Sequence, residues 1–174
     1  EVTEDEVKKA FYGLDNKSSA GDDGVSNLIA KAASEIVVPV LTLIIQKSFK
    51  RGVFPVVLKH AKVIPWHKDG SKSVENNYRP ISLLNVWSKI FERLMFNRVY
   101  FYMEHFSLFY KKQFGFCKKH STIDALIELM EKVRLFGAKN TSCFFIDLKK
   151  AFDTMIIQFF CSSLKSTGLG VKPI

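Results

Sequence analysis

Residues 144 to 153 read Phe-Phe-Ile-Asp-Leu-Lys-Lys-Ala-Phe-Asp, and they constrain the fold more than any other stretch. The continuous apolar run Cys143–Ile146 is typical of a buried strand. Asp147 follows this run directly, and Asp153 comes six positions later. Because Mg²⁺ prefers oxygen ligands, an acid at the end of a buried strand is well placed to bind a metal ion. Asp147 is therefore the first candidate metal ligand.

No acidic residue that could serve as a partner of Asp147 follows this stretch. From residue 154 to residue 174 there is no Asp or Glu. A single carboxylate does not suffice to hold a catalytic Mg²⁺ ion, which takes several oxygen ligands. We therefore expect any catalytic metal site built on Asp147 to be incomplete in this chain.

The composition indicates a folded and basic domain. The chain has 174 residues, 47% of them hydrophobic, which is enough to build a core. It carries 26 Lys and Arg against 17 Asp and Glu, a formal net charge of +9. Such a surface attracts polyanions, of which nucleic acid is the commonest. A merely solvated basic surface and an acidic membrane face are the alternatives.

The cysteines and the amino terminus bear on the compartment. Cys117, Cys143 and Cys161 are widely separated and suit neither a disulfide framework nor a zinc site. Because Cys143 and Cys161 lie in apolar stretches, we expect buried, reduced thiols in an intracellular protein. The acidic amino terminus and the absence of a run of about 18 apolar residues predict neither a signal peptide nor a membrane span. The missing initiator Met suggests a chain cut from a longer one.

Two helical segments are predicted in the first third of the chain. Thr3 and Glu6 have the spacing of a capping box, which predicts a short amphipathic helix after Thr3. Apolar pairs recur at helical spacing across Asn27–Arg51. Pro39 should break or bend that segment, giving two helices or one bent one.

Three more helices are predicted further along. Asn85 or Ser88 begins the first of them. Ser121 or Thr122 begins the second, with Asp124 in its first turn, where a carboxylate suits the helix dipole. Asp153 fits the N-cap of the last.

A β-hairpin is predicted between the helical regions. The stretches 61–66 and 78–84 read as strands, and the polar residues 67–77 between them form a long basic tip. Helices combined with a hairpin and one further strand predict an α+β fold.

Three segments together resemble the reverse transcriptases of non-LTR retrotransposons, the jockey-like and CR1-like LINE elements. They occur in the family's order and with similar spacing, and they are Val63–Lys68 with Asn77–Leu84, Gln113–Phe116 with His120–Leu126, and Phe145–Thr154. The amino-terminal helix also looks like the family's lead-in, so the resemblance covers nearly the whole chain.

The resemblance implies a partial reverse transcriptase domain over residues 1–174. Residues from about 1 to 140 would form mostly helical fingers that carry the basic hairpin. Residues from about 141 to 174 would begin the palm of a right-hand polymerase with its first strand, leaving the palm incomplete.

The resemblance also implies roles for individual residues. Asp147 would be a catalytic ligand of Mg²⁺, the expected cofactor, although an Asp that caps a turn is the alternative. Lys68 and Arg79 would close on the phosphates of the incoming nucleotide, and Arg suits phosphate because it forms paired hydrogen bonds. Phe152 would stack under the incoming sugar, with ordinary core packing as the alternative.

The sequence departs from the family's pattern at several places. Cys117 stands where the family usually has Arg, Asp22 stands where it has Pro, and Ile156 and Ile157 replace an Asp-His pair. The family's two later metal-binding aspartates, usually written YADD, do not occur in this chain. The substitutions at positions 22, 117, 156 and 157 look like drift in a decaying copy.

We therefore expect part of an RNA-directed DNA polymerase whose parent uses an RNA template, a DNA primer and deoxynucleotides, with no membrane partner. The parent would work in the nucleus by target-primed reverse transcription, and this chain alone would be inactive. A non-catalytic nucleic-acid-binding relic is the alternative function. A basic helical domain with no nucleic-acid role is the third.

Overall fold

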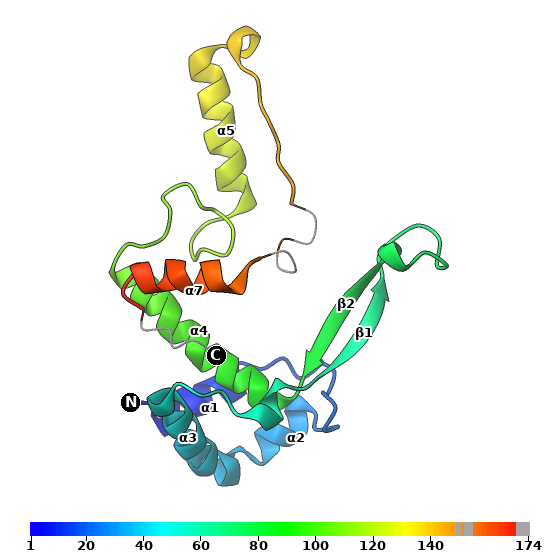
Figure 1. The fold of residues 1–174 in the computed structure, drawn as a ribbon, viewed down its shortest axis with the longest axis vertical. Coiled ribbons are helices and arrows are strands. Elements are labelled where there is room, and N and C mark those ends of the chain that lie inside the picture. The colour runs from blue at the N-terminus through cyan, green and yellow to red at the C-terminus, as the bar shows by residue number, and fades with distance from the viewer. Residues whose placement is uncertain (149–150, 152–154, 170–174) are drawn as a thin grey trace. The chain divides into compact units, whose positions relative to one another are not determined.

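The computed structural model describes residues 1–148, 151 and 155–169 (Figure 1). The chain divides into two compact units, Glu1–Tyr102 and Met103–Ile174. Helices are combined with one two-stranded antiparallel sheet, which is compatible with the predicted α+β class.

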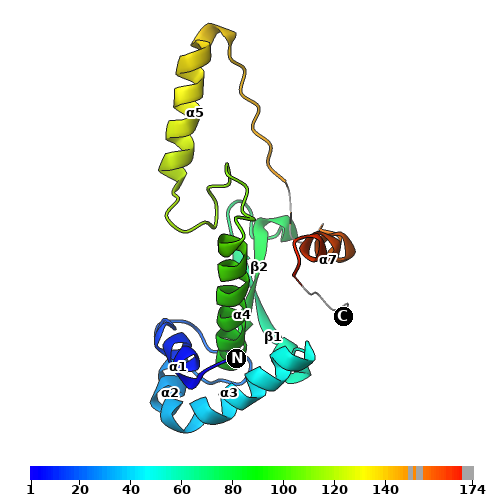
Figure 2. The same ribbon diagram turned by 90° about the vertical axis from the view of Figure 1, so that its left-hand side faces the viewer.

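The first unit is built from four helices and the hairpin. Figures 1 and 2 show α1, α2 and α3 grouped around the beginning of α4, which runs slightly past the unit's boundary. The helices are α1 (Glu4–Tyr12), α2 (Asn27–Ala32), α3 (Ser34–Arg51) and α4 (Val86–His105). A 3₁₀ turn, η1 (Val56–Lys59), precedes the hairpin.

The predicted starts of α1 and α4 are confirmed. The Thr3 side chain accepts a hydrogen bond from the Glu6 backbone N–H, and the Glu6 carboxylate accepts one from the Thr3 N–H at 3.0 Å, which completes the capping box. At α4 the Asn85 side-chain oxygen accepts a 2.8 Å bond from the Ser88 N–H. Each cap satisfies backbone donors that the first turn of a helix leaves without partners.

The segment Asn27–Arg51 does form two helices, but the break lies at Ala33 and not at Pro39. Pro39 lies within α3 on its exposed side. A carbonyl that loses its helical partner there is able to bond to water, which lowers the cost of the proline.

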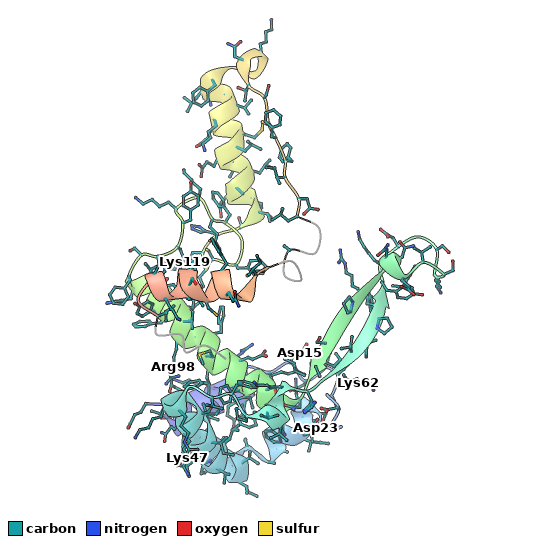
Figure 3. All side chains as sticks on the ribbon, in the orientation of Figure 1. Asp15, Asp23, Lys47, Lys62, Arg98 and Lys119 are labelled. Carbon is teal, nitrogen blue, oxygen red and sulfur yellow. The ribbon has the colours of Figure 1, made fainter. Side chains whose placement is uncertain are left out.

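The core of the first unit joins α1, α3 and α4. Phe91 on α4 is 1% exposed, and its ring meets the rings of Phe49 and Phe54 edge-on at centroid distances of 5.1 and 4.7 Å. Arg98, labelled in Figure 3, bonds to the Glu6 carboxylate at 3.1 Å and lies over the Phe49 ring. The three helices therefore share an apolar core, with the Arg98–Glu6 ion pair joining α4 to α1 at its edge.

The predicted hairpin is confirmed. Strands β1 (Ala61–His67) and β2 (Tyr78–Leu84) pair antiparallel, from Ala61 opposite Leu84 to His67 opposite Tyr78. A 3₁₀ turn, η2 (Glu75–Asn77), ends the tip loop. Figure 1 shows the hairpin projecting from the helices of its unit, and most of its residues are exposed.

The second unit contains α5 (Thr122–Phe136), the 3₁₀ turn η3 (Ala138–Asn140) and α7 (Ile157–Ser166). The predicted start of α5 is confirmed: Ser121 is its N-cap, and Ser121 and Asp124 form a second capping box. In the figures an extended segment leaves the end of α5 and runs back beside it.

That extended segment corrects the prediction of a buried strand at Cys143–Ile146. Residues 141–148 form neither strand nor helix, and the side chains of Phe144, Phe145 and Ile146 are 89%, 83% and 87% exposed. A strand needs a neighbour for its backbone hydrogen bonds, and within the described ranges the ladder of β1 and β2 is the only one. Cys143 is likewise exposed, against the prediction of a buried thiol.

The last helix begins later than expected. The N-cap of α7 is Ile156, which supplies no side-chain hydrogen bond. Asp153, the predicted cap, lies outside the described residues. The predicted end is close to the observed one, because Gly168 follows the helix with a left-handed φ of 85°.

Candidate nucleic-acid interface

The hairpin has two faces with different chemistry. Side chains alternate between the faces of a strand, so the register assigns each residue to one side. The Trp66 face comprises Lys62, Ile64, Trp66, Arg79, Ile81 and Leu83. The His67 face comprises Ala61, Val63, Pro65, His67, Tyr78, Pro80, Ser82 and Leu84.

Arg79 lies on the Trp66 face, directly opposite Trp66. It is exposed, and its guanidinium has no ion pair or hydrogen bond within the part of the chain that the structure describes. A guanidinium in this state is available to bind phosphate through paired N–H groups. The structure therefore leaves Arg79 able to fill its predicted role.

Lys68 begins the tip loop just beyond the end of β1. Its backbone N–H donates to the Asn77 carbonyl at 2.8 Å, which continues the ladder by one bond. Its ammonium group lies 3.8 Å from the Asp69 carboxylate, and both side chains are more than half exposed. An exposed pair of this length is weak, so a phosphate is able to compete for Lys68.

The tip loop is held by side chains of its closing residues. Asn77 donates from Nδ2 to the Ser71 carbonyl at 2.9 Å, and the Tyr78 hydroxyl donates to the Lys72 carbonyl at 2.9 Å. Gly70 has a left-handed φ of 75°, and a Cβ there would lie 2.7 Å from Asn77 Nδ2. The loop therefore presents Lys68 and Lys72 from a folded turn.

Sequence reasoning found the hairpin and its cations but missed the loop-closing bonds of Asn77 and Tyr78 and the position of Trp66 opposite Arg79. The spacing of Asn77 and Gly70 was a usable signal, because Asn and Gly are common where a loop closes on itself. Trp66 could have been paired with Arg79 once the strand register was written out.

The structure does not assemble a metal site around Asp147. The residue is exposed, and it follows the extended segment that replaces the predicted strand. Over residues 1–148, 151 and 155–169, no three His, Cys, Asp or Glu side chains are grouped so as to hold a metal ion. The described residues therefore form no metal site around Asp147. Phe152 lies outside the described residues.

A cleft of about 740 Å³ in the first unit is lined by residues of α1, α4 and the loop after α1. Two of its cations are already engaged: Lys89 donates to Ser18 and Arg93 donates to the Gly13 carbonyl. Partial burial raises the pKa of Glu92 on the same wall. These contacts hold the loop against α4 and give the cleft a structural role.

Among the described residues, no helix is long and apolar enough to cross a membrane.

Comparisons with known proteins bear on the whole chain. The family model for reverse transcriptase, the RNA-dependent DNA polymerase, matches residues 66–172. The chain is 34% identical over 164 residues to a probable RNA-directed DNA polymerase from transposon BS of Drosophila melanogaster, covering 92% of this chain and 18% of the relative. It is 34% identical over 161 residues to the RNA-directed DNA polymerase from mobile element jockey of the same species. This match covers 87% of this chain and 17% of the relative.

A third relative is the putative 115 kDa protein in the type-1 retrotransposable element R1DM of Drosophila melanogaster. It is 30% identical over 165 residues, which covers 94% of this chain and 16% of the relative. The chain thus spans about a sixth of the length of the curated relatives it matches.

Proposed function

We propose that the hairpin of this chain binds the phosphates of nucleic acid or of an incoming nucleotide. The premise is that the chain belongs to the reverse transcriptase family and is related to the polymerases of non-LTR retrotransposons. The observation that carries this proposal is the exposed, unengaged guanidinium of Arg79 on a projecting ribbon. The net charge of +9 supports it, because a basic surface concentrates polyanions.

In the finer proposal, Lys68 and Arg79 close on the phosphates of the incoming deoxynucleotide. Because side chains alternate along a strand, both belong to the Trp66 face. Arg79 is paired with Trp66, and Lys68 is the next residue of that face beyond Trp66. Residues from about 1 to 140 would act as fingers and from about 141 to 174 as the start of a palm. RNA template and DNA primer would be the partners, and the nucleus the place of action.

Asp147 and Phe152 keep their proposed roles as metal ligand and sugar-stacking residue. Reverse transcriptases generally use divalent metals, and Asp147 would contribute one carboxylate to such a site. The described residues form no such site. We propose instead that this chain alone does not polymerise. Primer extension on an RNA template with Mg²⁺ tests this, and incorporation well above a mock preparation would contradict it.

The phosphate-binding role is tested with Arg79→Ala and Lys68→Ala. Each variant should weaken binding of single-stranded RNA and flatten the dependence of log K on log salt by about one unit per lost contact. Lys47→Ala is the matched control, because Lys47 is an exposed cation on α3, away from the hairpin (Figure 3). Equal losses in all three variants would indicate general charge attraction only.

A non-catalytic nucleic-acid-binding relic is the second candidate function. It is favoured by the departures from the family pattern, such as Cys117 in place of the usual Arg. Both candidates predict RNA binding, so activity of the intact genomic reading frame separates them. Polymerisation by the product of that frame would rule the relic out.

A further inference from the structure

We propose that Trp66 is a stacking platform for an unpaired base of single-stranded nucleic acid, with Arg79 and Lys62 holding the neighbouring backbone. This site is additional to the phosphate contacts at the tip. It rests on the proposed function in taking nucleic acid as the partner and in using Arg79.

The two tryptophans of the chain differ in their surroundings. Trp66 is 61% exposed and makes no ring contact within the described residues. Trp87 packs against the core, and its ring meets that of Phe11 edge-on at 6.3 Å. A large indole left open on a projecting ribbon has a free π-face available for a ligand.

On the opposite face of the hairpin, the aromatic side chains next to Trp66 and Arg79 contact each other. The His67 and Tyr78 rings meet edge-on at 5.2 Å, and the Tyr78 hydroxyl is used by the Lys72 carbonyl. Both rings are also only partly exposed, whereas Trp66 is exposed. The more open aromatic surface therefore belongs to the Trp66 face.

The neighbours of Trp66 suit a single strand. Arg79 is directly across the ladder, where opposed side chains lie about 5 Å apart at Cβ. Lys62 lies four residues back on the same strand and the same face, and both cations are exposed. An aromatic platform flanked by cations along a groove or ribbon is the common arrangement for binding unpaired strands, because every base has a π-face and the backbone is anionic.

The side chains between these groups are apolar and partly open. Ile64 and Ile81 oppose each other on the Trp66 face and are 39% and 41% exposed. They give no hydrogen bonds to base edges. The site should therefore take bases with little sequence preference.

The experiment uses the full 174-residue chain and its own fluorescence. Trp87→Phe leaves Trp66 as the only indole, and Trp66→Phe leaves only Trp87. Titration with oligo(U) should quench the emission of the Trp87→Phe chain with the same midpoint as binding measured by anisotropy. The emission of the Trp66→Phe chain should change little.

Affinity supplies the second measurement. Trp66→Ala should weaken oligo(U) binding by about tenfold, as expected for the loss of one stacked base, while Trp66→Phe should retain part of the affinity. Val63→Ala is the control, because Val63 is 58% exposed on the His67 face of the same strand. It should bind as the parent chain does. A parallel titration with oligo(dT) separates a general single-strand platform, which predicts similar losses, from one restricted to RNA.

The outcomes distinguish this proposal from the proposed function. Loss of affinity in Arg79→Ala with unchanged affinity in Trp66→Ala would overturn the stacking platform and leave phosphate binding intact. Unchanged affinity in both variants would remove the hairpin as an interface altogether. Because Trp66 is exposed, its variants should keep the parent's thermal transition. Quenching of the Trp66→Phe chain as strong as that of the Trp87→Phe chain would also contradict the proposal.

Discussion

The two units bury their helices very differently. Every residue of the main core cluster belongs to the first unit, where α1, α3 and α4 each contribute several side chains. In the second unit α5 has no buried residue, and its apolar positions Ile123, Leu126, Ile127 and Met130 are between 52% and 65% exposed. The same kind of sequence pattern thus has two outcomes.

The difference shows that helix formation and helix burial have separate causes. Both α1 and α5 begin with a complete capping box, which is a local device. Burial of an apolar face needs a second surface, and the described residues supply one for α1 and none for α5. Most of the stability of a helix in a protein comes from such packing.

The largest test of this contrast is a pair of truncations. Phe91→Ala removes a ring that packs against two others, so it should lower the free energy of unfolding by about 3–5 kcal/mol. Met130→Ala, on α5 at 58% exposure, should change it by less than about 0.5 kcal/mol. Urea denaturation followed by circular dichroism measures both. Comparable losses would mean that α5 packs as firmly as α4.

A smaller effect is expected from the helix caps. Asn85→Ala removes the buried cap of α4 and should cost about 1 kcal/mol of global stability. Ser121→Ala removes the cap of α5, and the loss should appear as faster amide exchange within α5 alone. Hydrogen exchange resolved by residue separates the two. A loss of global stability in Ser121→Ala would show that the stability of α5 is coupled to that of the first unit.

The smallest expected effect concerns pH. Partial burial acts to raise the pKa of Glu6, but the Thr3 N–H and the Arg98 guanidinium outweigh it and hold that pKa below its ordinary value of 4.5. A depressed carboxyl pKa contributes stability above the unfolded-state value, and this contribution is lost as the pH falls through the folded-state value. Glu6→Gln should therefore melt lower than the parent at pH 6, and the gap should close below about pH 4.5.

Glu128 is the counterpart of Glu6 in the second unit. The Lys112 ammonium donates to the Glu128 carboxylate at 2.5 Å, and the Lys132 ammonium lies 3.2 Å from it. Both cations lower the pKa of Glu128, and they outweigh some desolvation. Since α5 is exposed, Glu128→Gln should leave the main melting transition unchanged at both pH values. A shift equal to that of Glu6→Gln would contradict the separation of the two units.

The sequence predicted those features that depend on nearby residues. The caps at Thr3 and Ser121 and the hairpin strands follow from short-range hydrogen bonding and alternation, and the structure confirms them. The break in the second helical segment was placed at Pro39 because the rule for proline ignores which side of the helix faces water.

The errors at Cys143–Ile146 have a different origin. An apolar run predicts burial only if some other surface covers it, and sequence alone does not show whether one is present. The residues of this run are exposed, so the predicted strand and the buried Cys143 thiol were both wrong. The same dependence explains why Asp147 could be located as a candidate but not given ligand partners.

The tip loop between β1 and β2 also affects which side chains of the two strands share a face of the hairpin. Side chains alternate strictly along each strand, so a shift of the register by one residue would move Arg79 to the opposite side of the ribbon from Trp66. An insertion of one residue between Lys68 and Asn77 that slipped β2 by one would separate this cation from its aromatic neighbour. An insertion absorbed within the loop, or a slip by two, would keep them on one side. The length of a loop that contains neither Trp66 nor Arg79 thus helps to decide whether the two side chains lie on the same face of the hairpin.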